Sequence, residues 1–523
     1  MTGTGILLRT FLRRDRWMVL WWSLGGALLY WSQAVSVDGL YATQAEFDRA
    51  AASMEGNATF IAMAGPARAL NTVGGQVTWQ ATAFGAVVAG LMSMFIVGRH
   101  TRAEEESGRD ELIRASVVHR LAPTTAAALT ALVANVVLGL LVAVSLATYP
   151  LAVADSVALG VGVALCGWVF TGTALVAAQL TSSTRGMYGF AGLVIGVSYT
   201  VRAVGDVGNP ALSWASPIGW YQAMHPFSGL RWWPALLLAV ASGAAVLVAF
   251  AVFARRDAGS GVLATRPGPA RAGPRLGSSF GLAWRLQRGT VLGWSAGLFL
   301  TGVAYGSIGD DVGDLIGDSA TSQDMFLQGA DDLVDGYFAT SLLMLGLTAC
   351  GFAISSALRA RSEEESGRVE ALLATGLSRR RWLLGQAGVT VAGTIAVLTA
   401  AGLGLGLGNV LVTGDAGAFV RLSLPVLAYV APVLVLASLA LLLACVSPRL
   451  GVVGWLPLLL AVVVMLFGEV LRFPDWTRQL SPFEHLALVP VESFRPVPVL
   501  VLLGVAVAAW AAAQAAFLRR DVR

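Results

Sequence analysis

Long apolar runs separated by short polar segments dominate the hydrophobic pattern of the chain. A bilayer core of about 30 Å needs roughly 20 apolar residues in each helix that crosses it. Twelve windows of this kind occur, at 17–37, 78–98, 122–148, 154–180, 187–203, 233–254, 289–309, 336–357, 384–412, 420–446, 450–470 and 496–517. The pattern therefore predicts an all-α polytopic membrane protein with about twelve transmembrane helices.

The composition narrows the class of protein further. Of 523 residues, 56% are hydrophobic and only 13% are charged, against about a quarter charged in ordinary globular proteins. A soluble protein of this composition could not cover its surface with polar groups. The composition excludes a cytoplasmic enzyme and a nucleic-acid-binding protein, and it makes the lipid bilayer the main surrounding of the chain.

The distribution of arginine predicts the orientation. With the N-terminus inside, 27 arginines fall in the inner segments and 8 in the outer ones, which agrees with the positive-inside rule. An even number of helices then places both termini in the cytoplasm. The basic residues are all arginine, and arginine without lysine amid abundant Ala, Gly, Val and Leu is typical of GC-rich bacterial genomes. We therefore expect a multi-pass protein of a bacterial plasma membrane.

An internal repeat divides the chain. RAEEESGRDELIRASVVHR at 102–120 aligns with RSEEESGRVEALLATGLSR at 361–379, with ten of nineteen positions identical. Arg255-Arg256-Asp257 is likewise matched by Arg519-Arg520-Asp521. Because each half holds six windows, the halves enter the membrane the same way up, as a parallel repeat. The predicted domains are two six-helix halves and a cytoplasmic Gly/Pro/Arg linker, at 1–254, 286–523 and 255–285 respectively.

The residue types present exclude several kinds of chemistry. A Walker A site requires a lysine, and the sequence has none. Three cysteines and four histidines show no metal-ligand spacing, and no catalytic constellation is evident. We expect a transport subunit without its own ATPase site, with no catalytic residue, no metal and no cofactor bound in this chain.

The two EEESGR segments are the main candidates for function. Glu105 with Arg109, and Glu364 with Arg368, have the i,i+4 spacing of favourable helix pairs. Each segment therefore predicts a short amphipathic helix along the inner membrane face. A lone charged run is usually a solvated loop, but such a loop has no reason to recur in two diverged halves.

Three other features leave alternatives open. Segments 6–17 and 280–289 interleave arginine with aromatic and apolar residues, which suits interfacial helices or simple positive-inside flanks. The loops 213–227 and 479–492 mix proline with aromatics, which suits re-entrant backbone or interfacial anchoring. The acidic loop 310–335 is a solvated face or a cation-attracting vestibule.

These features together resemble the ABC-2-type exporter permeases, and within them the actinobacterial branch of polyketide-antibiotic and multidrug exporters. The resemblance rests on the two E-E-E-S-G-R segments, the S-P-I-G-W and S-P-F-E-H loops, and six helices per half. It implies that the segment after each second helix is a coupling helix for a separate ATPase. This role would fall on Glu104, Glu105, Glu106, Ser107, Gly108, Arg109 and Glu111, and on Glu363, Glu364, Glu365, Ser366, Gly367, Arg368 and Glu370.

The resemblance also implies an outer gate, an energy source and a substrate class. The gate residues would be Ser216, Pro217, Trp220, Ser481, Pro482 and Phe483. Two copies of an ABC ATPase would bind one chain and would hold the ATP and Mg²⁺. Hydrophobic or amphipathic compounds, such as antibiotics, would move outward.

Two alternatives remain, a twelve-helix proton-coupled transporter of the major facilitator kind and a polytopic membrane enzyme. No ionisable residue lies in the middle of a transmembrane window except Glu469, near the outer end of its helix, whereas a proton pump needs an intramembrane relay. The sequence therefore favours an external energy source.

Overall fold

The computed structural model describes residues 2–40, 43–55, 58–256, 261–263, 270–309, 333–467 and 475–520. Helices, turns and bends make up this described part, which contains no strand. The chain divides into two compact units, Met1–Gly268 and Pro269–Arg523. The division falls inside the segment 255–285 that was predicted as a linker.

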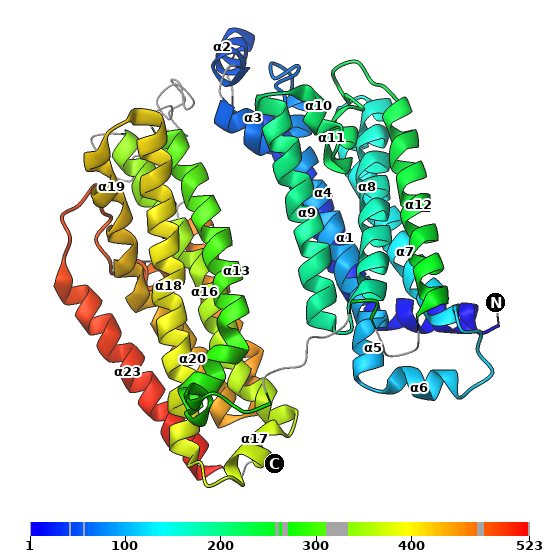
Figure 1. Cartoon of the computed structure of the whole chain (residues 1–523). Coiled ribbons are helices and arrows are strands. Elements are labelled where there is room, and N and C mark those ends of the chain that lie inside the picture. The colour runs from blue at the N-terminus through cyan, green and yellow to red at the C-terminus, as the bar shows by residue number, and fades with distance from the viewer. Residues whose placement is uncertain are drawn as a thin grey trace. The chain divides into compact units, whose positions relative to one another are not determined.

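The first unit contains six long helices (Figure 1). They are α1 (Thr4–Asp38), α4 (Val73–His100), α7 (Ala122–Ala147), α8 (Val153–Leu180), α9 (Thr184–Val207) and α12 (Trp233–Arg255). Shorter helices lie between them at both ends of the unit. These are α2 (Gln44–Glu55), α3 (Ala58–Ala64), α5 (Arg102–Glu106), α6 (Arg109–Arg114), α10 (Pro210–Ser213) and α11 (Pro217–Gln222).

The second unit repeats much of this order. Its described long helices are α13 (Ser279–Ile308), α16 (Leu333–Glu365), α18 (Arg379–Thr413), α20 (Val430–Val446) and α23 (Pro496–Arg519). The shorter ones are α17 (Arg368–Leu373), α19 (Ala416–Ser423), α21 (Leu456–Phe467) and α22 (Asp475–Gln479). Single 3₁₀ turns occur at Pro274–Gly277, Pro425–Tyr429, Pro448–Gly451 and Val453–Trp455.

The number of apolar spans differs from the twelve expected. Among the described residues, ten helices are long and apolar enough to cross a membrane. The window 17–37 lies in α1, a helix of 35 residues whose many tryptophans lower its mean hydropathy. The window 450–470 is interrupted by two 3₁₀ turns before α21 begins, because the prolines at 448 and 457 interrupt regular helix geometry.

Both segments predicted as interfacial are helical. Each is continuous with the membrane helix that follows it, in α1 and in α13. Helix α13 begins at Ser279, where the Ser278 hydroxyl accepts a hydrogen bond from the Gly281 N–H at 3.0 Å. The last residues of the predicted linker are therefore the first turns of a helix, because this N-cap starts it early.

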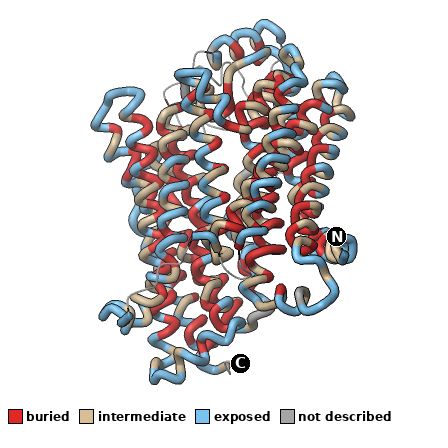
Figure 2. Tube along the Cα trace, turned by 45° about the vertical axis from the view of Figure 1, so that its right-hand side comes forward, coloured by how far each residue is buried: buried red, intermediate tan, exposed pale blue. Residues whose placement is uncertain are grey.

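The cores of the units lie around α4 and α8 in the first and around α16 in the second, and these helices are mostly buried (Figure 2). In α9, α12 and α23, only 22%, 22% and 17% of the most apolar window is buried, as expected of helices that face lipid. Small residues allow close helix packing in the second unit. A Cβ atom on Gly306 of α13 would lie 2.0 Å from the Leu405 carbonyl oxygen of α18, which is the use of small residues common in membrane helices.

Candidate functional site

The repeated S-G pair forms a sharp turn in both units. Gly108 separates α5 from α6 with φ +73°, and Gly367 separates α16 from α17 with φ +70°. Glycine adopts this left-handed conformation without the steric cost that a Cβ imposes. The preceding serines stabilise the turn, since Ser107 Oγ donates to the Glu104 carbonyl at 3.1 Å and Ser366 Oγ to the Glu363 carbonyl at 2.9 Å.

The turn changes which glutamate pairs with the motif arginine. The predicted pairs of Glu105 with Arg109 and of Glu364 with Arg368 are wrong. Arg109 Nη1 lies 3.6 Å from Glu104 Oε1, and Arg368 Nε donates to Glu363 Oε2 at 2.6 Å. Because the helix breaks at the S-G pair, residues with i,i+4 spacing across it no longer share a helix face.

The middle glutamate of the first motif joins its segment to the end of the last helix of its unit. Arg256 follows directly after α12, and its Nη2 donates to Glu105 at 2.6 Å while its Nε donates to Gln179 at 2.6 Å. Arg102 Nη1 also donates to Glu105, at 2.7 Å. Arg120 Nη2 donates to the Arg256 carbonyl at 2.6 Å. These contacts fix α5 against the end of α12.

The second unit contains the same arrangement. Arg520 follows α23 and its Nη2 donates to Glu364 at 2.5 Å. Arg379 Nη1 donates to the Arg520 carbonyl at 2.9 Å. We call these two sets the arginine clamps. They consist of Glu105, Arg120 and Arg256 in the first unit and of Glu364, Arg379 and Arg520 in the second.

The clamp arginines were missed as site residues by sequence reasoning, although a signal for them was present. The Arg-Arg-Asp triplets at 255–257 and 519–521 recur at matched positions, as do the final arginines of the two aligned segments. Repetition marked these residues as equivalent, but no local spacing connects Arg256 to Glu105, 151 positions away, or Arg520 to Glu364, 156 positions away.

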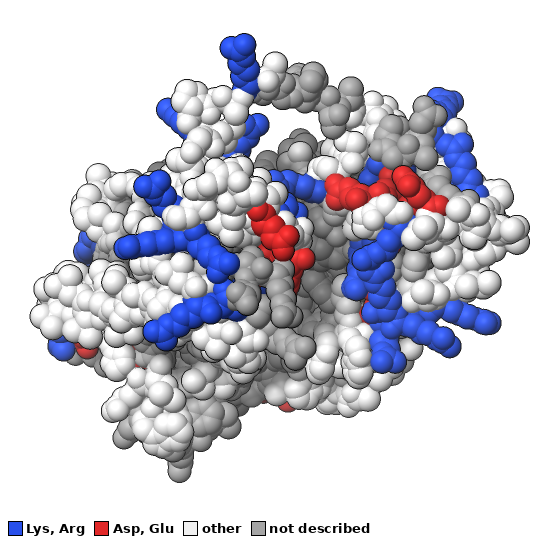
Figure 3. Space-filling view, turned by 90° about the horizontal axis from the view of Figure 1, so that it is seen from below, with Lys and Arg blue, Asp and Glu red and all other residues white. Residues whose placement is uncertain are grey.

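Other members of each motif are open to solvent, whereas Glu104 and Glu363 are buried. Glu111 and Glu370 are exposed, and the side chains of Arg109 and Arg368 are 60% and 58% exposed. Two apolar residues beside them, Leu112 and Val117, are 76% and 91% exposed. Figure 3 shows arginines gathered around a few acidic side chains at this end of the units.

Two motif glutamates make further local contacts. Glu106 accepts hydrogen bonds from the Thr184 N–H at 2.9 Å and the Thr184 hydroxyl at 2.6 Å. In the second unit, Arg361 Nε donates to Glu365 at 2.7 Å. Glu104 also pairs with Arg14 of α1, so that the acidic run of the first unit contacts α1, α9 and the end of α12. The segment is integrated into its unit and is not a free loop.

The outer loop of the first unit is built around α11. Ser216 is its N-cap, donates to the Ser198 carbonyl at 2.7 Å and accepts from the Ile218 N–H at 3.2 Å. Pro217 occupies the first turn, where its missing N–H costs nothing. Trp220 donates its indole N–H to the Trp214 carbonyl at 2.7 Å. Ser216 is buried, so this short helix is packed into the outer end of its unit.

The matching loop of the second unit contains turns instead of a helix. Ser481 and Pro482 are buried, and the Phe483 ring stacks on Tyr429 at 6.1 Å between centroids. Near the first loop, burial lowers the pKa of His225 to about 4, and the charges of Arg68 and Arg231 add to this effect.

The interior of the first unit contains charge that the sequence did not predict. Arg202 and Asp206 lie in α9, are buried, and approach to 3.3 Å. Arg202 Nη2 also donates to the Met63 carbonyl at 3.0 Å. No sequence pattern indicated this pair, because Arg202 falls at the very end of the window 187–203 and Asp206 lies beyond it. The pair is mutually neutralising, which makes its burial tolerable.

Two predicted features lie outside the part of the chain that can be described. These are Glu469 and nearly all of the acidic loop 310–335. Within the described ranges, no group of three or more His, Cys, Asp or Glu side chains is placed to hold a metal ion.

Comparison with known proteins gives two matches. Residues 276–518 match the family described as "Multidrug efflux system permease Rv1217c, C-terminal domain". The whole chain is 37% identical over 526 residues to the multidrug efflux system permease protein Rv1217c of Mycobacterium tuberculosis, and the alignment covers 100% of this chain and 96% of that protein. Together with its apolar helices, this similarity makes the chain a multi-pass protein of the cell membrane.

Proposed function

Because the chain belongs to the family of the multidrug efflux system permease Rv1217c, we propose that it is the membrane subunit of an ATP-driven exporter of the ABC-2 type. It moves hydrophobic or amphipathic compounds, including antibiotics, outward across the plasma membrane. Two copies of a separate ATPase subunit hold the ATP and Mg²⁺ and bind one chain. The observation that carries the proposal is the duplicated end of the second helix, with its glycine turn and its arginine clamp.

The contacts within each motif suggest one role for its exposed residues and another for its buried residues. The exposed members of the first motif, Arg109 and Glu111, contact the ATPase together with Leu112 and Val117. Arg368 and Glu370 do so in the second. The buried members, Glu105 and Glu364, hold the segment against the last helix of the unit. A push on α6 or α17 is thereby transmitted to α12 or α23.

The outer loops supply the gate in this proposal. Ser216 and Pro217 fix α11, whose Tyr221 hydroxyl donates to the Leu159 carbonyl of α8 at 2.8 Å. Ser481, Pro482 and Phe483 occupy the matched place in the second unit. Because α11 packs on the outer ends of four long helices, movement of these helices would open or close the loop.

The energy source separates this proposal from the proton-coupled alternative. The test uses inside-out vesicles that contain the chain with its ATPase and a fluorescent hydrophobic dye. We expect dye accumulation that requires ATP and persists when an uncoupler collapses the proton gradient. Accumulation driven by a proton gradient without ATP would contradict the proposal, as would ATP turnover by the isolated chain.

The docking surface is tested by a charge placed on an exposed apolar residue. Leu112→Asp should weaken ATPase binding at least tenfold, since it puts a solvated carboxylate where an apolar contact forms. Leu263→Asp is the matched control, because Leu263 is 55% exposed and lies outside α6. Both variants should reach the membrane in normal amounts. Equal ATPase binding by both variants would remove α6 from the docking surface.

A further inference from the structure

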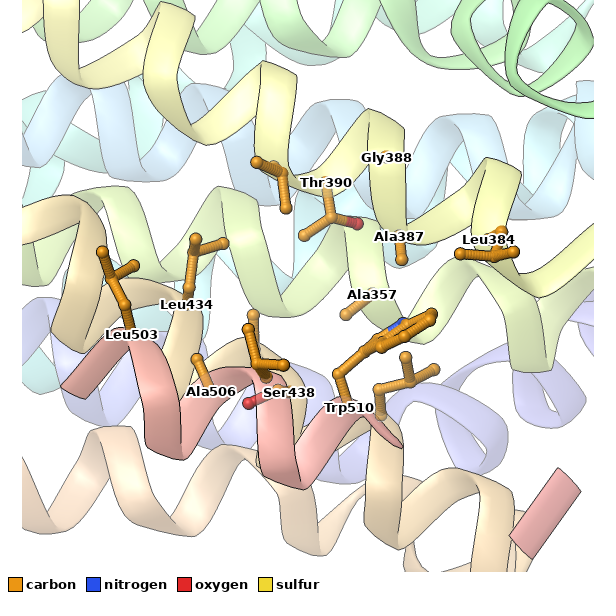
Figure 4. A pocket seen from close by; sticks show the side chains of 14 residues that line it. Ala357, Leu384, Ala387, Gly388, Thr390, Leu434, Ser438, Leu503, Ala506 and Trp510 are labelled. Carbon is orange, nitrogen blue, oxygen red and sulfur yellow. The ribbon is translucent and has the colours of Figure 1, made fainter. Parts of the chain in front are cut away.

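The second unit contains a cavity of about 310 Å³ between four helices (Figure 4). Its walls come from α16, α18, α20 and α23 and consist almost entirely of Ala, Leu, Val and Gly. A volume of this order is typical of small-molecule sites, which are mostly apolar with a few polar groups. The cavity is large enough for a compound and too apolar to hold ordered water.

One polar group in the cavity has no partner. The Trp510 indole reaches from α23 toward Ala357 and Ala387 (Figure 4). Its Nε1–H is inaccessible and makes no hydrogen bond within the described structure. A buried donor without an acceptor is unfavourable. A ligand that carries an acceptor would satisfy it, whereas a saturated lipid chain would not.

A hydroxyl on the opposite wall adds capacity for hydrogen bonding. Ser438 Oγ donates to the Val435 carbonyl at 2.9 Å, which leaves its lone pairs free to accept. The Thr390 hydroxyl also lines the cavity, but it already contacts Ser356 Oγ at 2.9 Å and donates to the Gln386 carbonyl at 3.3 Å. The cavity thus offers the Trp510 donor and hydroxyl acceptors in apolar surroundings. This combination suits an amphipathic compound with few polar groups.

The cavity reaches the outer surface of the unit. Three residues of its lining, Leu384, Val391 and Val507, are 42%, 40% and 64% exposed. On an apolar membrane helix these positions face lipid. Trp510 precedes the end of α23 by nine residues, about 14 Å along the helix axis, so the cavity lies toward the end that carries the C-terminus. In the predicted orientation this is the depth of the inner leaflet.

We propose that this cavity binds the exported compound and receives it sideways from the inner leaflet. The ligand is an apolar molecule with at least one hydrogen-bond acceptor directed at Trp510. The inference rests on the proposed export function and adds the place where substrate enters. Hydrophobic compounds concentrate in the bilayer, so a lateral opening meets them at a higher concentration than an aqueous one does.

The first unit lacks the groups that define this site. Val246 precedes Arg255 by nine residues, as Trp510 precedes Arg519, and therefore holds the matched position. Ala174 precedes Ser183 as Ser438 precedes Ser447 and is fully buried. Neither side chain can donate or accept a hydrogen bond. One such site per chain is therefore expected.

Photolabelling tests the binding directly, and benzophenone is a suitable probe because it is apolar and photoreactive and carries a single carbonyl acceptor. The purified full chain in lipid nanodiscs, without ATPase, is labelled and the modified peptides are mapped by mass spectrometry. We expect saturable labelling of α18 and α23 around the cavity. Ala506→Phe, which fills the cavity, should reduce this labelling at least tenfold. Ala508→Phe, on the exposed side of the same helix, should leave it unchanged.

A milder variant covers the case in which Ala506→Phe fails to fold. Trp510→Phe keeps an aromatic ring but removes the N–H, and should raise the half-saturating benzophenone concentration about fivefold to tenfold. Unchanged labelling in Trp510→Phe and Ala506→Phe would overturn the proposal. A variant that loses labelling but keeps normal ATP-driven dye export would overturn the proposal too, since the cavity would then not be the site that binds the exported compound. Failure of the wild-type complex to export any dye would contradict the proposed function, independently of the labelling result.

Discussion

The inner ends of the two units use different chemistry to join the first helix to the second. In the first unit, the buried Asp15 of α1 contacts His100 at 2.5 Å and Arg99 at 2.9 Å on α4. Phe11 stacks on the His100 ring at 3.9 Å between centroids. The joint is therefore ionic, with Asp15 and His100 buried and the Arg99 side chain 38% exposed.

The second unit makes the same joint with neutral groups. Gln287 holds the position of Asp15, because each lies seven residues before a Trp-Ser pair, Trp294-Ser295 and Trp22-Ser23 respectively. Gln287 accepts from Ser356 Oγ at 2.7 Å and donates to Gln386 at 3.2 Å, while Ser356 contacts Thr390 at 2.9 Å. The arginine clamps, by contrast, are alike in both units. What both units share is thus the link from the motif to the last helix, and what differs is the packing beneath it.

The largest effect is expected from removing a clamp carboxylate. Glu105→Ala leaves Arg102 and Arg256, both buried, without their acid, and loss of one partner of a buried pair costs about 3–5 kcal/mol. Glu364→Ala should cost less, because Arg520 is 19% exposed. Thermal unfolding in nanodiscs measures the loss of stability in both variants. Glu111→Ala, which removes an exposed carboxylate, is the control. Equal losses for Glu105→Ala and Glu111→Ala would refute the clamp.

The ionic joint gives the next largest effect. Asp15→Asn keeps the shape but removes the charge between Arg99 and His100, and should cost about 2–3 kcal/mol of stability. Gln287→Glu makes the opposite change in the second unit by burying a carboxylate beside the neutral side chains of Ser356 and Gln386, and should cost a similar amount. Chemical denaturation in mixed micelles compares them. If Asp15→Asn left the free energy of unfolding unchanged, the ionic joint would contribute no more to stability than a neutral one.

The glycine turns should respond equally in the two units. Gly108→Ala and Gly367→Ala each force a Cβ into the left-handed region, at about 1–2 kcal/mol. A Cβ at either position would meet no atom within 4 Å, so the cost is purely conformational. Asparagine, which tolerates this region, should restore part of the stability at both sites. The measurement is the unfolding temperature of the alanine and asparagine variants at both glycines. A larger loss of stability with asparagine than with alanine would contradict this account of the turn.

The smallest effect concerns pH at the outer loop of the first unit. The folded pKa of His225 lies at about 4, below the ordinary value of 6.5. Between these values the unfolded state binds the proton first, so stability present above pH 6.5 is lost as the pH falls toward 4. Partial exposure screens the effect to below about 1 kcal/mol. His225→Gln should flatten the pH profile of unfolding over this range, and an unchanged profile would exclude His225 as its source.

The sequence was sufficient to predict the helical membrane class and the two motifs. Apolar runs long enough to span a bilayer fold as helices because the backbone has no other partner in lipid. The local composition gave an ambiguous prediction of a membrane span in two places. These are the tryptophan-rich helix α1 and the proline-interrupted segment before α21.

The roles of the motif glutamates could not be predicted from spacing. Glu105 pairs with a residue 151 positions away and Glu364 with one 156 positions away. Such contacts depend on the tertiary packing of the last helices, α12 against α8 and α23 against α20, which no local periodicity encodes. The exposed members of the motif remain as the sequence placed them, available to a partner.

The stoichiometry of the complex with the ATPase tests the central claim most directly. Native mass spectrometry of the purified permease with its ATPase subunit should give two ATPase copies per chain. Leu112→Asp should reduce the main species to one copy, since it damages only the docking surface of the first unit. A wild-type complex with a single ATPase copy, or no complex at all, would contradict an exporter with two equivalent coupling ends.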